Sequence, residues 1–321
     1  MTTFGDRVFQ LGGVPVGGLF NAGQSYFLRP STGSDGNQGK SPNDAFKTWS
    51  AAHDALTADS GDTLYVIAED NSASGTTDYQ SDTLTLSKDG VNYVGVNAGG
   101  LFGQRSRIAQ LSTATGVAPL VSFTGSNCFM SGIHIFHGVN DATSKDAAIS
   151  VTGERNHFYR CHFAGIGHAT MDVAANSSLA LGLGGDENLF EDCVIGLDTI
   201  GRGTAANSEI KFVASAYAKR NVFKNCIIPT WADANTHQFI LTGAGSMYTF
   251  ALFENCSFIN SSGTTMTEAF DVSATQAGNI LLKDCMLVGC TEWEAGDAGN
   301  VFCLGAVGDA DITGIAIEPA V

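Results

Sequence analysis

The chain has 321 residues, of which 39 are glycine and only 15% are charged. Its 16 Lys and Arg residues stand against 32 Asp and Glu residues, and the resulting net charge of −16 argues against nucleic acid as a partner. High glycine and low charge favour many short strands over helices, and no apolar run reaches the roughly 18 residues of a membrane helix. We therefore expect neither a nucleic-acid partner nor membrane insertion.

The first segment, residues 1–25, is apolar and rich in glycine. It lacks the cationic start and apolar core of a secretory signal, which predicts a protein made in the cytoplasm. We expect an extended attachment segment that docks on another protein or subunit, with folding back onto the following helix as the alternative. Its candidate contact residues are apolar: Phe4, Val8, Phe9, Leu11, Val14, Val16 and Leu19.

Residues 26–60 predict an entry strand, a turn and a capping helix. The turn carries Asp35, Asn37 and Gly39, which resemble part of a calcium loop but lack its bidentate Glu, so a plain turn is favoured. From Asp44 to Leu56 the apolar residues follow helical spacing, after a Ser-Pro start typical of a helix N-terminus. We expect this amphipathic helix to cover the open end of the structure that follows.

Residues 61–321 contain a repeat that cysteines mark. Each copy follows a frame such as Asn221-Val-Phe223-Lys-Asn-Cys226, with a large apolar residue three positions before the cysteine. Two looser copies place Gly132 and Gly314 where the others have cysteine. Intervals of 32, 33, 30 and 29 residues predict a solenoid. The five regular cysteines are Cys161, Cys193, Cys226, Cys256 and Cys285.

The frame also predicts how each copy folds. Phe and Cys, three residues apart, both reach the interior only if the strand turns a corner between them. The residue before Cys is Asp or Asn in four copies, with Arg160 as the exception, and Asp and Asn tolerate a left-handed backbone. We therefore predict an all-β, right-handed parallel β-helix of about 7–9 coils, with a one-residue register change at the two glycine copies.

Two internal columns follow from this stacking. The thiol column is expected to consist of the five regular cysteines as free thiols rather than disulfides. The apolar column is predicted to contain Phe129, Phe158, Phe190, Phe223, Phe253 and Leu282.

The entry to the repeat resembles a known family. The turn Gly33-Ser-Asp-Gly-Asn-Gln-Gly39, the Ala-rich helix and the strand beginning Gly61-Asp-Thr63 are similar to the entry of pectate-lyase-like right-handed β-helix proteins. The resemblance covers about residues 26–317 and implies the fold but no single function, because enzymes, adhesins and viral spikes share it. The apolar first segment resembles the openings of tailed-phage virion proteins that carry a β-helix.

The outward positions beside the internal columns are largely apolar on one side of the solenoid. Such stripes mark interfaces, so we expect side-by-side trimer packing or docking on another virion protein, with loops folded over the stripe as the alternative. The candidate interface residues are Leu189, Val194, Val222, Ile227, Leu252, Leu281 and Met286. The next outward column alternates in charge and is expected to stabilise the register: Glu191, Lys224, Glu254 and Lys283.

Polar residues predict no catalytic site, cofactor or metal. The strands before each repeat, residues 301–304 included, carry only Lys211 and Asp271 as charges, too few for a calcium-binding carboxylate cluster with a base. The acids between residues 186 and 198 could include a glycosidase pair, but ladder and loop roles are favoured. After the register change His134 and His162 are expected to stack, with His137 and His168 nearby, yet their spacing is not that of a zinc site.

These observations predict a non-enzymatic phage virion protein at the virion surface, made in the host cytoplasm. It would be a homotrimeric capsid decoration protein or short head spike that contacts itself and another virion protein such as the major capsid protein. The alternative is a tailspike that binds or cleaves host surface polysaccharide. A third interpretation, a secreted β-helix adhesin or lyase, is disfavoured by the missing signal and the free thiols.

Overall fold

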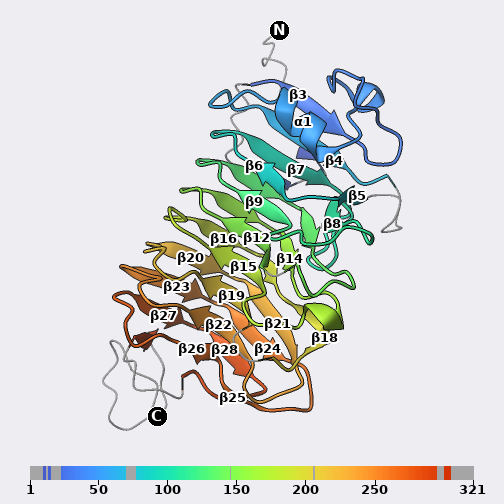
Figure 1. Cartoon of the computed structure of the whole chain (residues 1–321). Helices are drawn as coiled ribbons and strands as arrows, with labels where there is room; N and C mark the ends of the chain where they lie inside the picture. Colours follow the sequence, from blue (N-terminus) through green and yellow to red (C-terminus); the bar gives the residue numbers. More distant parts are fainter. Residues whose placement is uncertain are drawn as a thin grey trace.

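A computed structural model describes residues 10–11, 14–15, 23–69, 77–144, 146–204, 207–294 and 300–304. They form a right-handed parallel β-solenoid of about seven turns with few helical residues, which confirms the fold predicted from the repeat. The strands stack along one axis from the N-terminal to the C-terminal end (Figure 1). None of the helices in these ranges is long and apolar enough to cross a membrane.

Three parallel sheets run along the solenoid, and successive turns pass through sheets 1, 2 and 3 in that order. Sheet 1 contains β3 (Ser25–Leu28), β4 (Thr63–Ile67), β7 (Asn92–Val96), β10 (Phe129–Ser131), β13 (His157–Tyr159), β16 (Leu189–Glu191), β20 (Asn221–Lys224), β23 (Phe250–Glu254), β27 (Asn279–Lys283) and β30 (Val301–Leu304). Sheet 2 contains β5 (Thr77–Gln80), β8 (Arg107–Gln110), β11 (His134–Phe136), β14 (His162–Ala164), β17 (Val194–Ile195), β18 (Leu197–Arg202), β21 (Ile227–Ala232), β24 (Ser257–Asn260) and β28 (Met286–Val288). Sheet 3 contains β6 (Leu84–Leu86), β9 (Val121–Phe123), β12 (Ala147–Val151), β15 (Ser177–Leu181), β19 (Ser208–Phe212), β22 (Gln238–Thr242) and β26 (Phe270–Asp271).

Two strand pairs and three short helices complete the described structure. The pairs are antiparallel β1 (Gln10–Leu11) with β2 (Val14–Pro15), and parallel β25 (Met266–Glu268) with β29 (Cys290–Glu292). The helices are the 3-10 helices η1 (Pro42–Asp44) and η2 (Ala169–Met171), and the α-helix α1 (Trp49–Ala55).

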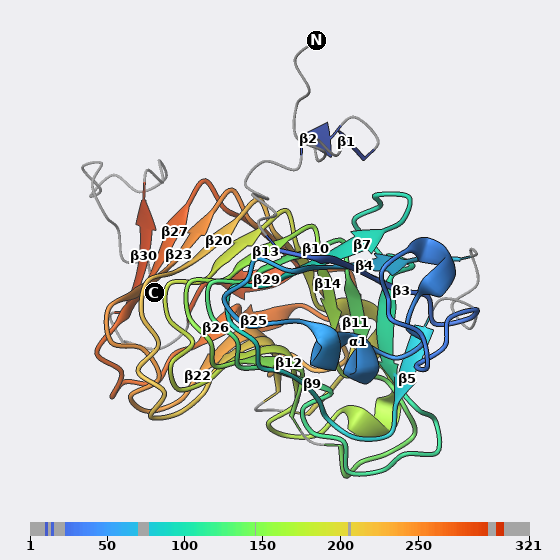
Figure 2. The same cartoon turned by 90° about the horizontal axis from the view of Figure 1, so that it is seen from above.

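The helix α1 lies at the N-terminal end of the solenoid, as Figures 1 and 2 show. Its buried Trp49 packs against the ring of Tyr93 in sheet 1, and Tyr93 Oη lies 3.0 Å from Nδ1 of His53. The predicted helix over residues 44–56 was too long. Phe46 instead pairs with Leu28 of β3 as an isolated bridge, so α1 begins after Thr48, whose side chain accepts from Ala51 N–H.

The interior of sheet 1 holds a column of stacked rings. Phe190 lies 4.8 Å from Phe158 and 4.7 Å from Phe223, with interplanar angles of 7°. Phe129 is not in this column, contrary to the prediction. It pairs with the outward-facing His157, and Met130 is the fully buried residue beside Phe158.

The position of Phe129 outside the column follows from the way the chain turns the corner between sheets 1 and 2. Gly132, with φ of 66°, occupies the corner position that Arg160 fills one turn later with φ of 52°, so Ile133 rather than Gly132 takes the place of Cys161. The predicted one-residue shift at this copy is confirmed, because His134 pairs with His162, and it already applies at Met130, which pairs with Phe158. The regular corners have the predicted left-handed backbone at Asp192, Asn225, Asn255 and Asp284.

The cysteines follow the corner on its inner side. All eight are free thiols, and Cys161, Cys193, Cys226 and Cys256 are buried while Cys285 is half-buried. Each of these five thiols approaches the carbonyl of the internal residue one turn earlier, for example Cys226 Sγ at 3.3 Å from Phe190 O. The tight corner leaves little room in the interior, and the small side chain of cysteine fits this buried position.

The last described strand also differs from the prediction. Residues 301–304 were expected to precede a repeat, but β30 continues sheet 1, where Cys303 pairs with Leu282. The copy predicted at Gly314 lies outside the described residues.

A second ladder lies at the corner between sheets 3 and 1. Buried Asn188 accepts the Asn156 N–H at 3.0 Å, and Asn221 accepts the Asn188 N–H at 3.0 Å. Their amide nitrogens donate to glycine carbonyls of earlier turns, for example Asn221 Nδ2 to Gly185 O at 2.8 Å. The first residue of the Asn-x-Phe frame thus satisfies the backbone groups that the turn leaves unpaired.

Candidate functional site

The outer face of sheet 1 carries a continuous apolar column. Leu189, Val222, Leu252 and Leu281 pair in register on four successive strands, and each is half-buried. We call these four residues the apolar column. It lies on a regular sheet surface, where its aliphatic side chains form an unbroken outward row.

Charge ladders flank the apolar column on both sides. On one side Lys224 lies 3.6 Å from Glu191, and Lys283 lies 2.5 Å from Glu254. Lys283 lowers the pKa of Glu254. On the other side Glu187 forms ion pairs with Arg155 and Arg220. The two flanks are therefore paired internally, and the face has little net charge.

The second predicted apolar stripe does not share this face. Val194, Ile227 and Met286 lie on sheet 2, across the corner from the apolar column. Val194 is fully buried and Ile227 is half-buried, whereas Met286 is 49% exposed. The corner that brings Phe and Cys to the same interior also sends the residue before Phe and the residue after Cys to two different outer faces.

The candidate contact residues of the first segment lie almost entirely outside the described residues. These are Phe4, Val8, Phe9, Val16 and Leu19. Leu11 and Val14 pair with each other in the β1–β2 hairpin, which forms a sheet of its own apart from the three solenoid sheets.

Four of the five acids that could have formed a glycosidase pair have partners on neighbouring turns: Asp186, Glu187, Glu191 and Asp192. Asp186 pairs with Lys219 at 3.3 Å, and Asp192 accepts from Asn225 Nδ2 at 3.1 Å. Glu191 contacts Lys224 and also His157 Nε2 at 3.2 Å. The geometry thus gives these carboxylates register-holding partners rather than a shared substrate position.

The histidines of sheet 2 lie as closely as predicted. The rings of His134 and His162 stack at 4.5 Å with an interplanar angle of 6°. Gly103 N–H donates to His162 Nδ1, so the other ring nitrogen carries the proton toward Gly196 O at 3.0 Å. Burial lowers the pKa of His162 and of His137 to about 4. Within the described ranges, no group of three or more His, Cys, Asp and Glu side chains is placed to hold a metal ion.

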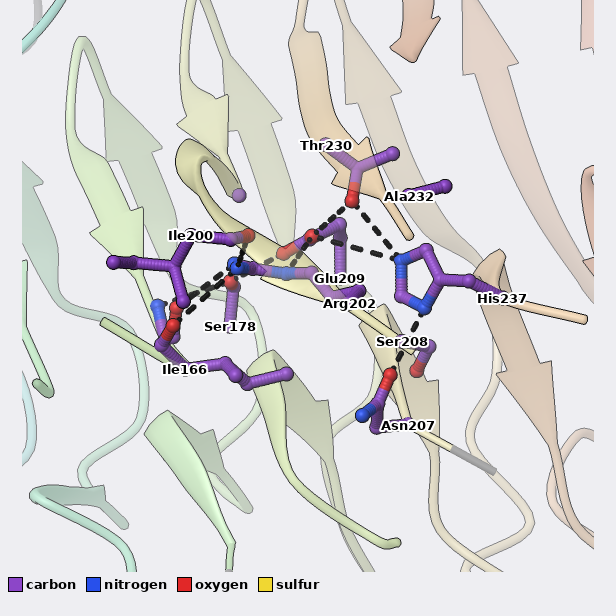
Figure 3. Close-up of polar contacts among 12 residues, drawn as sticks. Ile166, Ser178, Ile200, Arg202, Asn207, Ser208, Glu209, Thr230, Ala232 and His237 are labelled. Carbon is purple, nitrogen blue, oxygen red and sulfur yellow. Dashed lines mark hydrogen bonds and ion pairs between the residues drawn. The ribbon is translucent and has the colours of Figure 1, made fainter. Parts of the chain in front are cut away.

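A buried polar network at the corner between sheets 2 and 3 is absent from the sequence predictions (Figure 3). Arg202 ends β18 and Glu209 lies in β19, and Arg202 Nε lies 2.9 Å from Glu209 Oε1. Thr230 Oγ1 donates to the same oxygen at 2.8 Å, and Ser178 Oγ donates to Glu209 Oε2 at 2.7 Å. His237 completes the network with Nε2 at 3.0 Å from Thr230 Oγ1.

The rest of the Arg202 guanidinium binds backbone. It donates to the carbonyls of Gly165, Ile166 and Ile200 at 3.1, 3.3 and 2.6 Å. Arg202 and Glu209 are both fully buried. The network therefore connects strand β18 to two turns of the solenoid. A charged pair seven residues apart in a chain with few charges was its only sequence signal.

Burial shapes the protonation of this network. It raises the pKa of Glu209, against the lowering effects of Arg202 and of the Ser178 and Thr230 hydroxyls. Burial and the neighbouring Arg202 lower the pKa of His237 to about 3. Because its side chains are closed off from solvent and bonded to one another, the arrangement holds structure together and offers no position for a reacting group.

The fold resembles those of polysaccharide-acting enzymes. A rhamnogalacturonan lyase covers 83% of this chain and 68% of its own, with a TM-score of 0.52 and 16% identity. The pectin methylesterase PemA from Erwinia chrysanthemi covers 89% of this chain and 91% of its own, with a TM-score of 0.53 and 13% identity. The protein ORF18 of Geobacillus virus E2 aligns with a TM-score of only 0.28 at 11% identity, which supports no argument. No protein-family model and no curated protein matches the chain.

These similarities confirm the pectate-lyase-like β-helix fold and correct one prediction. The sequence predicted a protein without enzymatic activity, and this is contradicted by two solved structures that share the fold, since both are named as enzymes. At identities of 13 and 16% the likeness establishes the fold and not an activity.

Proposed function

We propose that the chain is a virion-surface protein of a tailed phage, a capsid decoration protein or short head spike that assembles as a homotrimer. The observation that supports self-assembly is the outer face of sheet 1. Its apolar column is flanked by internally paired charges, the pattern of an interface with an apolar centre and a polar rim. The column crosses four strands, a length of roughly 14 Å at the usual strand spacing of about 4.8 Å.

Side-by-side packing of three solenoids would cover this face. A face with little net charge pairs with a second copy at low electrostatic cost, whereas a strongly charged partner would gain nothing from ladders that are already neutral. In a ring each copy presents the apolar column to its neighbour, and such a head-to-tail contact closes after three copies if the rotation allows it.

Residues 1–25 would attach the trimer to another virion protein such as the major capsid protein. This proposal is supported by the β1–β2 hairpin, which belongs to none of the three solenoid sheets. Removing the hairpin would therefore leave the stack of coils intact. The eight free thiols agree with synthesis in the reducing host cytoplasm before display on the virion.

Oligomeric state tests the assembly. We expect the full chain to sediment as a trimer at micromolar concentration, and the double variant Leu189→Asp with Leu252→Asp to sediment as a monomer with unchanged circular dichroism. Leu183→Asp is the matched control, because Leu183 is 71% exposed and lies outside the apolar column. A monomeric wild-type chain, or a trimeric double variant, would refute the assignment of this face.

Particle incorporation tests the attachment segment. Deleting residues 2–22, which spares Gln24 and Ser25 and their contacts with Asp62 and Thr63, should leave the solenoid folded and abolish incorporation into phage particles. Normal incorporation of the deleted chain would contradict the proposal.

A second candidate function is a spike that binds or cleaves host surface polysaccharide. It is favoured by the two solved structures above, whose names refer to action on rhamnogalacturonan and on pectin. Its test is the release of reducing ends, unsaturated uronide or methanol from host polysaccharide by the purified chain. Release of any of these products at a rate proportional to protein concentration supports cleavage, and unchanged polysaccharide size restricts this candidate to binding.

A further inference from the structure

Arginines and histidines gather on the outer face of sheet 2, away from the apolar column. Arg107 of β8 pairs in register with His134 of β11, whose other neighbour is His162 of β14. Arg105 lies close enough to lower the pKa of both Arg107 and His134, after the larger effect of burial. Three successive turns thus contribute basic side chains to one surface.

The segment before β8 folds over this surface. Gln104 Nε2 donates to the carbonyl of Arg160 at 2.7 Å, and Gly103 N–H reaches the ring of His162 at 3.0 Å. Arg160 therefore borders the same surface from the corner before β14. We define the arginine cluster as Gln104, Arg105, Arg107, His134 and Arg160.

The arginines of the cluster differ from the other described arginines in their lack of counter-charge. Arg105, Arg107 and Arg160 form no ion pair with any described residue, although the chain carries twice as many acids as bases. Every arginine elsewhere in the described ranges has a carboxylate partner: Arg29, Arg155, Arg202 and Arg220. Neighbouring cations repel each other, so an anion bound among them would relieve an existing cost.

The buried polar atoms of the cluster also favour a bound ligand. His134 is only 6% exposed, and the one hydrogen-bond contact of its ring among the described residues is with the backbone of Gln104, itself a member of the cluster. Three further buried atoms of the cluster have no hydrogen-bond partner among the described residues: Nε of Arg107, Nε of Arg160 and Oε1 of Gln104. A buried polar atom without a partner costs about 1–3 kcal/mol, which a ligand oxygen could recover.

The surroundings favour an anion carried by a sugar. The guanidinium of Arg107 lies over the ring of Phe136 at 4.5 Å, a contact that holds its plane, and a planar guanidinium suits a planar or tetrahedral anion. The ring of Phe102, 53% exposed, lies 5.8 Å from His162 and offers an apolar face at the border of the cluster. Aromatic faces beside charged groups suit a ligand that is apolar on one side and anionic on the other.

We propose that the arginine cluster binds a carboxylate or phosphate group of an anionic glycan, with Arg105 and Arg107 as its main contacts and His134 behind them. This proposal rests on the second candidate function, in which the glycan belongs to the host surface polysaccharide, but it does not require that the glycan is cleaved. It also separates the two faces of the solenoid, because sheet 1 would serve assembly while sheet 2 would face the host surface.

Calorimetric titration of the full chain tests this site with three probes. They are a tetrasaccharide that contains glucuronate, inorganic phosphate, and neutral cellotetraose. We expect the wild-type chain to bind at least one anionic probe and not cellotetraose. Arg105→Gln with Arg107→Gln should weaken that binding at least tenfold, and a His134 ring signal followed by NMR should shift with the anion and not with the neutral sugar.

The matched control is Arg155→Gln with Arg220→Gln, which removes two arginines that already have carboxylate partners. It should leave binding unchanged. Preference for the glucuronate probe assigns a uronate carboxylate, and preference for phosphate assigns a phosphorylated glycan. Binding of neither anion, or equal affinity in the wild type and the Arg105/Arg107 variant, would overturn the proposal. Because oligomeric state and product release are measured separately, failure here leaves the assembly and cleavage tests independent.

Discussion

Replacing Arg202 with methionine tests the account of the buried network. The variant Arg202→Met keeps much of the side-chain volume but removes the ion pair with Glu209 and the hydrogen bonds to three carbonyls. Both members of the pair are fully buried. Removing one partner of such a pair leaves the other charge uncompensated, which costs about 3–5 kcal/mol of unfolding free energy.

The loss of unfolding free energy in Arg202→Met should also depend on pH. Burial holds the folded pKa of Glu209 above its ordinary value of 4.5, so the contribution of this carboxyl is greatest below pH 4.5 and falls as the pH rises through the folded pKa. Arg202 lowers that pKa, and its removal raises it further. The destabilisation of Arg202→Met relative to the wild type should therefore be smaller at pH 4.5 than at pH 8.

Urea unfolding at both pH values, followed by circular dichroism, measures the effect. Hydrogen exchange of β18 and β19 checks for local opening, because a solenoid can unfold in segments. Arg155→Met is the matched control, since Arg155 is exposed and solvent screens its ion pairs with Glu154 and Glu187, so their loss should cost far less than the loss of the buried pair. If Arg202→Met and Arg155→Met cost the same, or if the Arg202→Met loss shrinks at high pH, the reasoning is wrong.

Three further predictions concern the repeat. At the corner residue Asp192, where φ is 54°, Asp192→Gly should preserve the urea midpoint whereas Asp192→Val should cost about 1–2 kcal/mol, and equal midpoints would contradict the corner argument. Phe223→Ala should cost about 3–5 kcal/mol because its ring is fully buried between two others, while Lys224→Ala on the outer face should cost less than about 1 kcal/mol; urea unfolding compares them. Burial raises the pKa of Cys290 and Cys303 to about 11, so a thiol reagent should modify the folded chain slowly at pH 7 and faster at each step up to pH 10, and fast reaction at pH 7 would refute this.

The candidate surfaces were only partly visible in the sequence. The alternation Glu191, Lys224, Glu254, Lys283 and the leucines beside it could be read directly, because parallel stacking brings residues one repeat apart into register. The division of the outward residues between two faces could not be read, since it depends on the angle of the corner. The burial of Val194 depends on tertiary packing as well.

The solenoid could be predicted from the sequence alone. Its repeat length and thiols recur in each of the five regular copies, and the Asp or Asn corner and the internal ring recur in four of them, so like residues stack on successive turns. Three features came from tertiary packing alone: Met130 replaces Phe129 in the core, Arg202 reaches Glu209, and the segment before β8 completes the arginine cluster. The physical reason is that these features arise where the repeat is irregular. Loops of unequal length fold over the outer faces there, and no periodic pattern records which side chains they bring together.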